Sequence, residues 1–216
     1  MILKEPIQTG CSHTCSAGCY DAPFDLTALT TNFPLKPFYF MRHGETEWNQ
    51  QSLIQGCTDI SLNEKGIEQA HLAAQKLKNI PIDNIISSPL QRALKTAEIA
   101  GQALGKPITI IDTLKNGCYG SIEGKSKHEH REAYTGWRTG YKIEHAEHYH
   151  CFTKRVFAGF QEALQYPGLT LIIAHGGVYW PIQDMLNLNA STIPNATPVL
   201  HLPPSQGQDT WIIKEL

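Results

Sequence analysis

Short runs with strand character alternate with longer segments of helical periodicity along most of this 216-residue chain. The runs span residues 38–41, 82–87, 108–111 and 169–174, and each has the length and composition of a buried strand. Between them, apolar side chains recur at helical spacing, first from an N-cap at Asn63 to residue 79 and again after Ser88-Pro89. This alternation predicts a mostly parallel sheet with helices on both faces, an α/β fold of the three-layer α/β/α sandwich type.

The rest of the chain divides into an extension, a lid and a final helix with two strands. Residues 1–36 mix Cys, Ser, Thr, Gly and Pro without periodicity, so we interpret them as a Cys-containing N-terminal extension to a domain of residues 37–216. Polar, His-rich sequence at about 121–146 predicts a small lid insertion, and residues 152–163 a helix after it. A further helix is expected from Val178 towards Leu188, with short strands near 199–202 and 210–213.

Charge and hydropathy exclude several classes of protein. The formal net charge is -2, and no dense stripe of Lys and Arg is present to contact a nucleic acid backbone. No apolar run approaches the length of a membrane span, and the first ten residues lack the continuous apolar stretch of a secretory signal. We therefore expect a cytoplasmic protein whose partner is a small molecule, with no nucleic acid and no membrane.

Two groups of residues raise the question of a metal site. Cys11, Cys15 and Cys19, with His13 between them, offer soft ligands, but they lack the two-residue knuckle spacing typical of zinc sites. The alternative is a leader with free thiols. The second group comprises lid histidines without a helical ligand register: His145, His148 and His150. We expect no metal and no cofactor.

Histidine and arginine side chains follow the predicted strands at equivalent positions. Arg42 and His43 follow the first strand, His175 follows residues 169–174, and Arg92 lies near the start of the helix after Ser88-Pro89. In open α/β sheets, ligands bind beyond the carboxyl ends of the strands, so these side chains should converge. Arginines, histidines and a helix N-terminus suit a dianionic phosphoryl group, and a neutral histidine can attack its phosphorus. Taken singly, each would be read as a buried histidine or an exposed helical arginine.

Arg42-His43-Gly44 also opens an ordered series of short motifs. The series continues with Glu45-Thr46-Glu47-Trp48-Asn49, Gln55-Gly56, Asp59, Leu62, Gly66, Gln69-Ala70, Ser87-Ser88-Pro89-Leu90, Arg92-Ala93, Thr96-Ala97, Gly120, Glu123-Gly124 and Ala174-His175-Gly176-Gly177. From about residue 38 to its end, the chain resembles the histidine phosphatase superfamily, the phosphoglycerate mutase-like family with an Arg-His-Gly signature at the end of the first strand. Each motif falls on a predicted strand end or helix start, which makes coincidence remote.

The resemblance implies a role for each matched residue. His43 would be the nucleophile that forms a phosphohistidine, Arg42 and Arg92 would hold the phosphate, and His175 would stabilise the transferred group. We also assign to substrate binding the residues Asn49, Gln55, Gly56, Asn116 and Gly176. The implied activity is phosphoryl transfer without a metal.

One position departs from the family pattern. Relatives carry a glutamate where this chain has Asn116, and that acid protonates the departing alkoxide. An amide can hydrogen-bond a leaving oxygen but cannot deliver a proton to it. Glu123, Glu47 and a lid histidine are the candidate replacements.

The lid and the missing acid leave three functions to distinguish. The short lid favours a phosphatase of a small phosphorylated metabolite over a phosphoglycerate mutase, because a mutase must protect its intermediate from water. The third function is a catalytically impaired regulatory protein that binds phosphate esters. The polar lid residues are interpreted mainly as solvated surface, with some in contact with substrate: Lys127, His128, His130, Arg131, Arg138, His145, His148 and His150. The aromatic lid residues are interpreted as packing: Tyr134, Trp137 and Tyr141.

Overall fold

The computed structural model describes residues 33–205 and 210–216. The candidate ligands Cys11, Cys15 and Cys19 therefore lie outside the described residues. Phe33, which we placed in the extension, is buried, and its ring centroid lies 6.0 Å from those of Phe157 and Trp211. No described helix is long and apolar enough to cross a bilayer.

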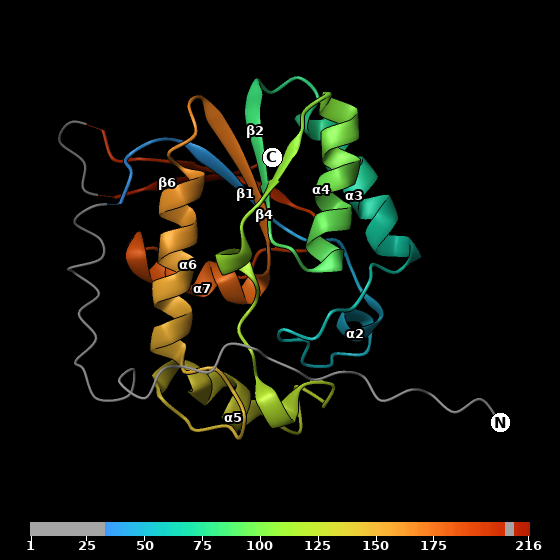
Figure 1. The fold of residues 1–216 in the computed structure, drawn as a ribbon, viewed down its shortest axis with the longest axis vertical. Coiled ribbons are helices and arrows are strands. Elements are labelled where there is room, and N and C mark those ends of the chain that lie inside the picture. The colour runs from blue at the N-terminus through green and yellow to red at the C-terminus, as the bar shows by residue number, and fades with distance from the viewer. Residues whose placement is uncertain (1–32, 206–209) are drawn as a thin grey trace.

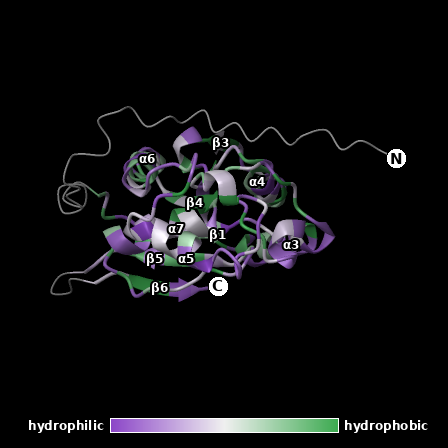
Figure 2. Cartoon of the chain, turned by 90° about the horizontal axis from the view of Figure 1, so that it is seen from below, coloured by the Kyte–Doolittle hydropathy of each residue, from purple (hydrophilic) through white to green (hydrophobic). Residues whose placement is uncertain are grey.

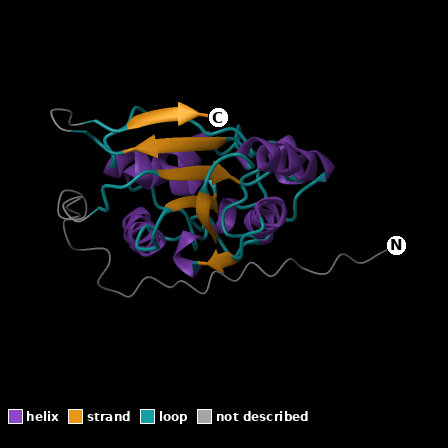
Figure 3. Cartoon of the chain, turned by 90° about the horizontal axis from the view of Figure 1, so that it is seen from above, coloured by secondary structure: helices purple, strands orange, loops and turns teal. Residues whose placement is uncertain are grey.

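One sheet forms the centre of the fold (Figure 3). Its strands are β1 (Phe38–Arg42), β2 (Ile82–Ser87), β3 (Ile108–Ile110), β4 (Leu169–Ala174), β5 (Pro198–Leu202) and β6 (Ile212–Glu215), in the order β3-β2-β4-β1-β5-β6. The first four strands in that order pair in parallel, β5 pairs antiparallel to β1, and β6 pairs antiparallel to β5. The sheet is thus mixed, with the parallel core that the sequence predicted.

Helices cover both faces of the sheet (Figure 1). The α-helices are α2 (Glu47–Gln50), α3 (Glu64–Leu77), α4 (Gln91–Leu104), α5 (Arg131–Gly136), α6 (Tyr149–Ala163) and α7 (Gly176–Met185). Alternate residues of β1 belong to two different cores: Phe38 and Phe40 pack with α6 and α7, whereas Tyr39 and Met41 pack with α3 and α4. Figure 2 shows the apolar residues gathered around the strands between these helices. This arrangement confirms the three-layer α/β/α sandwich.

Local signals explain where the helices begin. The Asn63 side chain accepts a hydrogen bond from the Gly66 amide and caps α3 at the predicted N-cap. Helix α7 starts at Gly176 rather than at the predicted Val178, because His175 in extended conformation already serves as its N-cap. Helix α2 was not predicted, because it is too short to show apolar periodicity; it is marked instead by a capping box between Thr46 and Asn49.

The predicted lid contains more regular structure than its polar sequence suggested. Three short pieces lie in or beside it: the 3₁₀ turns at Gly120–Ile122 and Trp137–Thr139, and α5 between them. Trp137 is buried and contacts the rings of Tyr119, Tyr149 and Phe152, with centroid distances of 4.7 to 5.2 Å. The lid is therefore packed onto the body of the domain.

The strand register brings three chain segments to the same edge of the sheet. Arg42 pairs with Ala174, and Ser87 pairs with Ile173, so β1, β2 and β4 end side by side. Beyond these ends, the His43 amide donates to the Ala174 carbonyl and the Ser88 amide donates to the Ile173 carbonyl, each at 3.0 Å. His43 and Ser88, which leave the sheet here, are thus held by backbone hydrogen bonds before any side chain contributes.

Candidate active site

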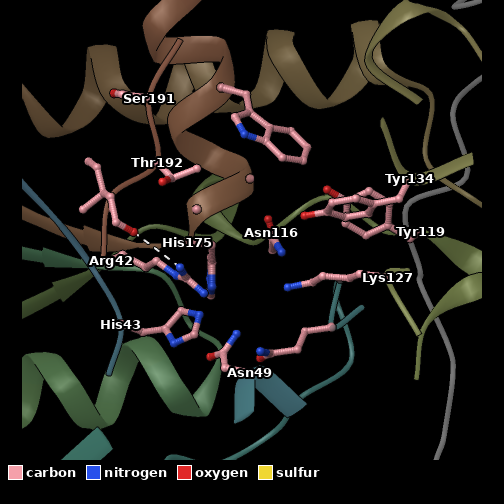
Figure 4. A pocket seen from close by; sticks show the side chains of 16 residues that line it. Arg42, His43, Asn49, Asn116, Tyr119, Lys127, Tyr134, His175, Ser191 and Thr192 are labelled. Carbon is pink, nitrogen blue, oxygen red and sulfur yellow. Dashed lines mark hydrogen bonds between the residues drawn. The ribbon is translucent and has the colours of Figure 1, made fainter. Parts of the chain in front are cut away.

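A cavity of about 120 Å³ opens beyond the carboxyl ends of β1 and β4 (Figure 4). Most of the residues that we assigned from the sequence line it: Arg42, His43, Asn49, Gln55, Gly56, Asn116, His175 and Gly176. The remaining lining residues are Tyr119, Lys127, Tyr134, Gly177, Trp180, Ser191, Thr192 and Ile193. The volume is well below the roughly 300–1,000 Å³ of sites for drug-sized ligands, which suits a small ligand.

A backbone contact fixes the tautomer of His43. Its Nδ1 lies 2.6 Å from the Gly44 carbonyl oxygen. Because a carbonyl only accepts, Nδ1 must carry the proton, and Nε2 of the neutral ring keeps its lone pair. Burial, followed by the charges of Arg92 and Arg42, holds the pKa of His43 well below its usual value of 6.5. The ring is therefore neutral at neutral pH and has the form that a nucleophile requires.

His175 lies next to His43, with 5.2 Å between the ring centroids. Its Nε2 is 2.7 Å from the Ser88 hydroxyl, and within the described residues its buried Nδ1 has no hydrogen-bond partner. Burial and then the charge of Arg92 hold its pKa well below 6.5 as well. A buried polar atom without a partner, beside a cavity, is a group that a ligand can satisfy.

The two arginines differ in how they are used. Arg42 lines the cavity, its Nη1 donates to the Ile193 carbonyl at 3.4 Å, and its buried Nε finds no partner in the described residues. Arg92 is fully buried behind the lining, where its Nη1 donates to the Thr58 carbonyl and its Nη2 to the Gly56 carbonyl. Burial lowers the pKa of Arg92 to about 10, so both guanidiniums remain charged at neutral pH.

Short loops hold the amide groups of the cavity wall. The Asn49 Oδ1 accepts from the Thr46 amide in the capping box, at 3.3 Å, which leaves the Asn49 amide nitrogen for the cavity. Gly56 adopts φ +59°, and a Cβ at this position would overlap the Glu123 carboxylate at 1.9 Å. Only glycine therefore allows the loop to pass so close to Glu123 while its carbonyl accepts from Arg92.

Asn116 lies in the cavity wall, but no carboxylate from the described chain joins it there. Glu123 cannot substitute as the acid, since its oxygens accept from the Cys57, Thr58 and Tyr119 amides and the Thr58 hydroxyl. Glu47 is exposed and bonds Gln51 at 2.6 Å. The lid histidines are also missing from the lining within the described residues.

The lid instead contributes Lys127, Tyr119 and Tyr134. Tyr134, which we interpreted as packing, does pack against Tyr119 and Trp180, and it also faces the cavity. Tyr141, which we also interpreted as packing, is 46% exposed and does not line the cavity. Residues 191–193 also line the cavity, and the Asn195 side chain supports it, with its Nδ2 donating to the His43 carbonyl at 2.8 Å; none of these residues was predicted from the sequence. These residues follow α7 in a loop without a pattern that singles them out.

The structure also bears on the question of a metal. In the described part of the chain, the only side chains grouped closely enough to share an ion are Cys57, Cys118 and Glu123. The Glu123 carboxylate already accepts four hydrogen bonds, so it is poorly placed to act as a ligand. His145, His148 and His150 do not form such a group.

Comparison with known proteins gives the family. Residues 38–196 match the model of the histidine phosphatase superfamily (branch 1). A Bacillus subtilis protein named "Uncharacterized phosphatase PhoE" is 39% identical over 63% of this chain and 69% of its own length. A Salmonella arizonae protein named "Probable phosphoglycerate mutase GpmB" is 34% identical over 64% of this chain and 68% of its own length.

Solved structures agree on the fold. The structure of the mycobacterial glucosyl-3-phosphoglycerate phosphatase superimposes with a TM-score of 0.70 at 23% identity, over 83% of this chain and 97% of that one. The motifs, the sheet order and the convergent histidines lead to one family. The chain belongs to the histidine phosphatase superfamily (branch 1), and it is an enzyme of that family.

Proposed function

We propose that this protein hydrolyses phosphate monoesters of small metabolites through a phosphohistidine at His43. The observation that carries the proposal is the hydrogen bond from His43 Nδ1 to the Gly44 carbonyl, which leaves Nε2 unprotonated within a cavity that also presents Arg42. A neutral nucleophile beside fixed positive charge is the arrangement that a phosphoryl dianion requires.

In the first step, His43 Nε2 attacks phosphorus and the bond between phosphorus and the leaving oxygen breaks. Arg42 and the amides at the start of α7 hold the equatorial oxygens. The Arg42 Nε, the Arg92 Nε and the His175 Nδ1 are among the buried atoms without a partner in the described residues, and they can join them. In the second step, water attacks phosphorus, the bond to Nε2 breaks and inorganic phosphate leaves. Asn49, Gln55, Gly56, Asn116 and Gly176 bind the substrate around this centre.

The test is hydrolysis of p-nitrophenyl phosphate by the purified protein and by His43→Ala. We expect the wild type to turn over this ester and His43→Ala to lose that turnover. After rapid quenching, the wild type should carry an acid-labile phosphate on His43. His71→Ala, an exposed position on α3, is the matched control and should keep wild-type turnover. Turnover that survives in His43→Ala would refute the proposal.

Two rival functions have distinct outcomes. A mutase would convert 3-phosphoglycerate into its isomer without releasing inorganic phosphate, which ³¹P NMR distinguishes directly. A regulatory binding protein would bind inorganic phosphate in calorimetry and turn over none of the esters; the lack of a carboxylate among the described lining residues favours this alternative. The shortness of the lid, at about residues 121–146, supports the phosphatase, because a mutase must shield its phosphohistidine from water.

A further inference from the structure

The proposed reaction needs a proton for the leaving oxygen, and the cavity offers no carboxylic acid from the described residues. Three lining side chains that can donate a proton come from the chain between β3 and α6: Tyr119, Lys127 and Tyr134. Burial raises the pKa of both tyrosines, which makes their phenols weaker acids. This leaves the ammonium group of Lys127 to consider.

The backbone around Lys127 is firmly held. The Gly124 amide donates to the Ile54 carbonyl at 2.8 Å, the Ile54 amide to the Lys125 carbonyl at 2.9 Å, and the Lys127 amide to the Ser52 carbonyl at 3.0 Å. The lid segment therefore runs beside the loop that leads from α2 to Gln55 and Gly56. This ladder fixes the position from which the Lys127 side chain extends.

The Lys127 side chain is half-buried, and it forms no salt bridge with any described carboxylate. Figure 4 shows its ammonium directed into the open space beside Asn116 and His175, across from the His43 ring. Its Nζ also lies 5.9 Å from the centre of the Tyr134 ring. A half-buried ammonium that lines a cavity and has no carboxylate partner in the described chain is free to act on a ligand.

We infer that Lys127 is the proton donor to the leaving oxygen and takes the place of the acid that Asn116 cannot be; this inference rests on the proposed function. As the bond between phosphorus and oxygen breaks, a proton passes from Nζ to that oxygen, and Lys127 becomes a neutral amine. Before the second step Lys127 regains its proton from solvent, and in that step the proton of the attacking water leaves with the phosphate product as the bond between phosphorus and Nε2 breaks. Lys127 ends the cycle as an ammonium.

The surroundings of Lys127 support this role. Burial, and then the charge of Arg42 on β1, lower its pKa from 10.5, whereas Tyr134 on α5 presents a ring without charge. An acid works best when its pKa approaches the working pH, so this shift makes the ammonium a better donor. Asn116 then contributes hydrogen bonding to the same leaving oxygen.

Lys127→Met tests the inference against leaving groups of different basicity. General acid catalysis is worth about 10²–10⁴-fold, so we expect a loss of that size in kcat for an alkyl phosphate such as glycerol 2-phosphate. For p-nitrophenyl phosphate, whose leaving group needs little protonation, the loss should stay within about tenfold. Lys125→Met, an exposed neighbour outside the cavity, is the matched control and should follow the wild type with both substrates.

Two further variants separate the proton from the charge and from the fold. Lys127→Arg keeps the positive charge but holds its proton too tightly, so it should also lose alkyl phosphate turnover with little change in KM. Adding Asn116→Glu to Lys127→Met should restore alkyl phosphate turnover by at least tenfold, which also shows that the variant folds. In the wild type, alkyl phosphate turnover should fall as the pH rises through the lowered pKa of Lys127, and this alkaline decline should be absent from Lys127→Met.

The outcomes distinguish this inference from the proposed function. Equal losses for both leaving groups in Lys127→Met would make Lys127 a phosphate-binding cation and overturn the inference, although His43-dependent turnover would remain. A leaving-group-selective loss in Tyr134→Phe, without one in Lys127→Met, would overturn it in favour of the phenol. A wild type inactive towards p-nitrophenyl phosphate would remove the proposed function itself.

Discussion

Arg155 and Glu147 form a buried two-point ion pair, with the Arg155 Nε and Nη2 each 2.7 Å from a different oxygen of the Glu147 carboxylate. The two side chains are 13% and 3% exposed. The same guanidinium donates to the carbonyls of Thr113, Lys115 and Asn116. Arg155 on α6 thereby joins the end of the lid to the segment that carries Asn116 into the cavity.

Arg155→Met should strongly destabilise the fold. Removing one partner of a buried pair leaves an uncompensated charge and typically costs about 3–5 kcal/mol. Arg138→Met is the matched control, because the pair of Arg138 with Asp184 is 30% and 36% exposed and such pairs contribute about 0–1 kcal/mol. Urea unfolding measures the free energy of unfolding of each variant. Equal losses in the two variants would show that the buried pair stabilises the fold no more than the exposed pair does.

Gly44→Ala should displace His43, the nucleophile of the proposed reaction. A Cβ at Gly44 would lie 2.3 Å from the Gly66 carbonyl oxygen, and because that atom is backbone, the start of α3 would have to move away from the end of β1. Overpacking of this kind typically costs about 1–3 kcal/mol. We also expect turnover of p-nitrophenyl phosphate to fall, since Gly44 adjoins His43.

Gly105→Ala is the control for Gly44→Ala. Gly105 ends α4 with φ +64° and has no atom within 4 Å of an added Cβ, so the variant should cost about 1–2 kcal/mol through backbone strain and leave turnover unchanged. If Gly44→Ala retained full activity, the close approach of the two glycines would not be what positions His43.

Buried His201 should make stability depend on pH. Its ring stacks on Phe38 at 4.5 Å, its Nε2 lies 2.9 Å from the Tyr179 hydroxyl, and burial lowers its pKa from 6.5 to about 4. Between these values the unfolded chain binds a proton that the folded chain does not. The contribution of neutral His201 to the free energy of unfolding is therefore complete above pH 6.5. As the pH falls towards 4, the free energy of unfolding decreases by about 2–3 kcal/mol for this reason.

Tyr179→Phe combined with His201→Leu tests this prediction, because it removes the titrating ring and the hydroxyl that bonds it. Urea unfolding at pH 7.5 and 4.5 should show a loss about 2–3 kcal/mol larger in the wild type than in the double variant. The other buried histidines are common to both proteins, so they cancel in the difference. Equal losses of unfolding free energy in the wild type and the double variant would mean that His201 is not neutral in the folded state.

His43 should be observed as the Nδ1-protonated neutral tautomer. Burial and the two arginines disfavour the imidazolium, so the ring should stay neutral as the pH falls through 6.5 and protonate only well below it. Long-range ¹H–¹⁵N NMR reports both the tautomer and the midpoint. Arg42→Gln removes one repelling charge and should move the midpoint up towards 6.5; a wild-type midpoint near 6.5 would contradict the assignment.

The sequence predicted best those elements whose apolar pattern is determined by burial. Residues 82–87 and 169–174 are strands with the expected bounds, because both faces of a parallel sheet are covered and the strand reads as apolar. The last strand is Ile212–Glu215 rather than residues 210–213, since all its residues are exposed and no burial pattern sets its limits. Helix α2 depends on a cap alone and was missed.

The site likewise contains residues that a sequence pattern predicts and residues that only the folded chain brings into place. Arg42, His43 and His175 were placed together because the ends of parallel strands must meet. Glu123 was a reasonable replacement acid in the sequence, but whether a carboxylate is available depends on which amides fold against it. Lys127 was only one of several polar lid residues, because its approach to the cavity depends on pairing with residues 52–54, which no local pattern reveals.

Strand β4 lies between β1 and β2 and is the last of the three to be synthesised. During synthesis, residues 38–42 and 82–87 emerge first, and neither segment can pair with residues 169–174 until that strand has also emerged. The level strand ends that bring His43, Ser88 and His175 together cannot exist before then. A growing chain can therefore bring these three residues together only in one late step, after β4 has been made.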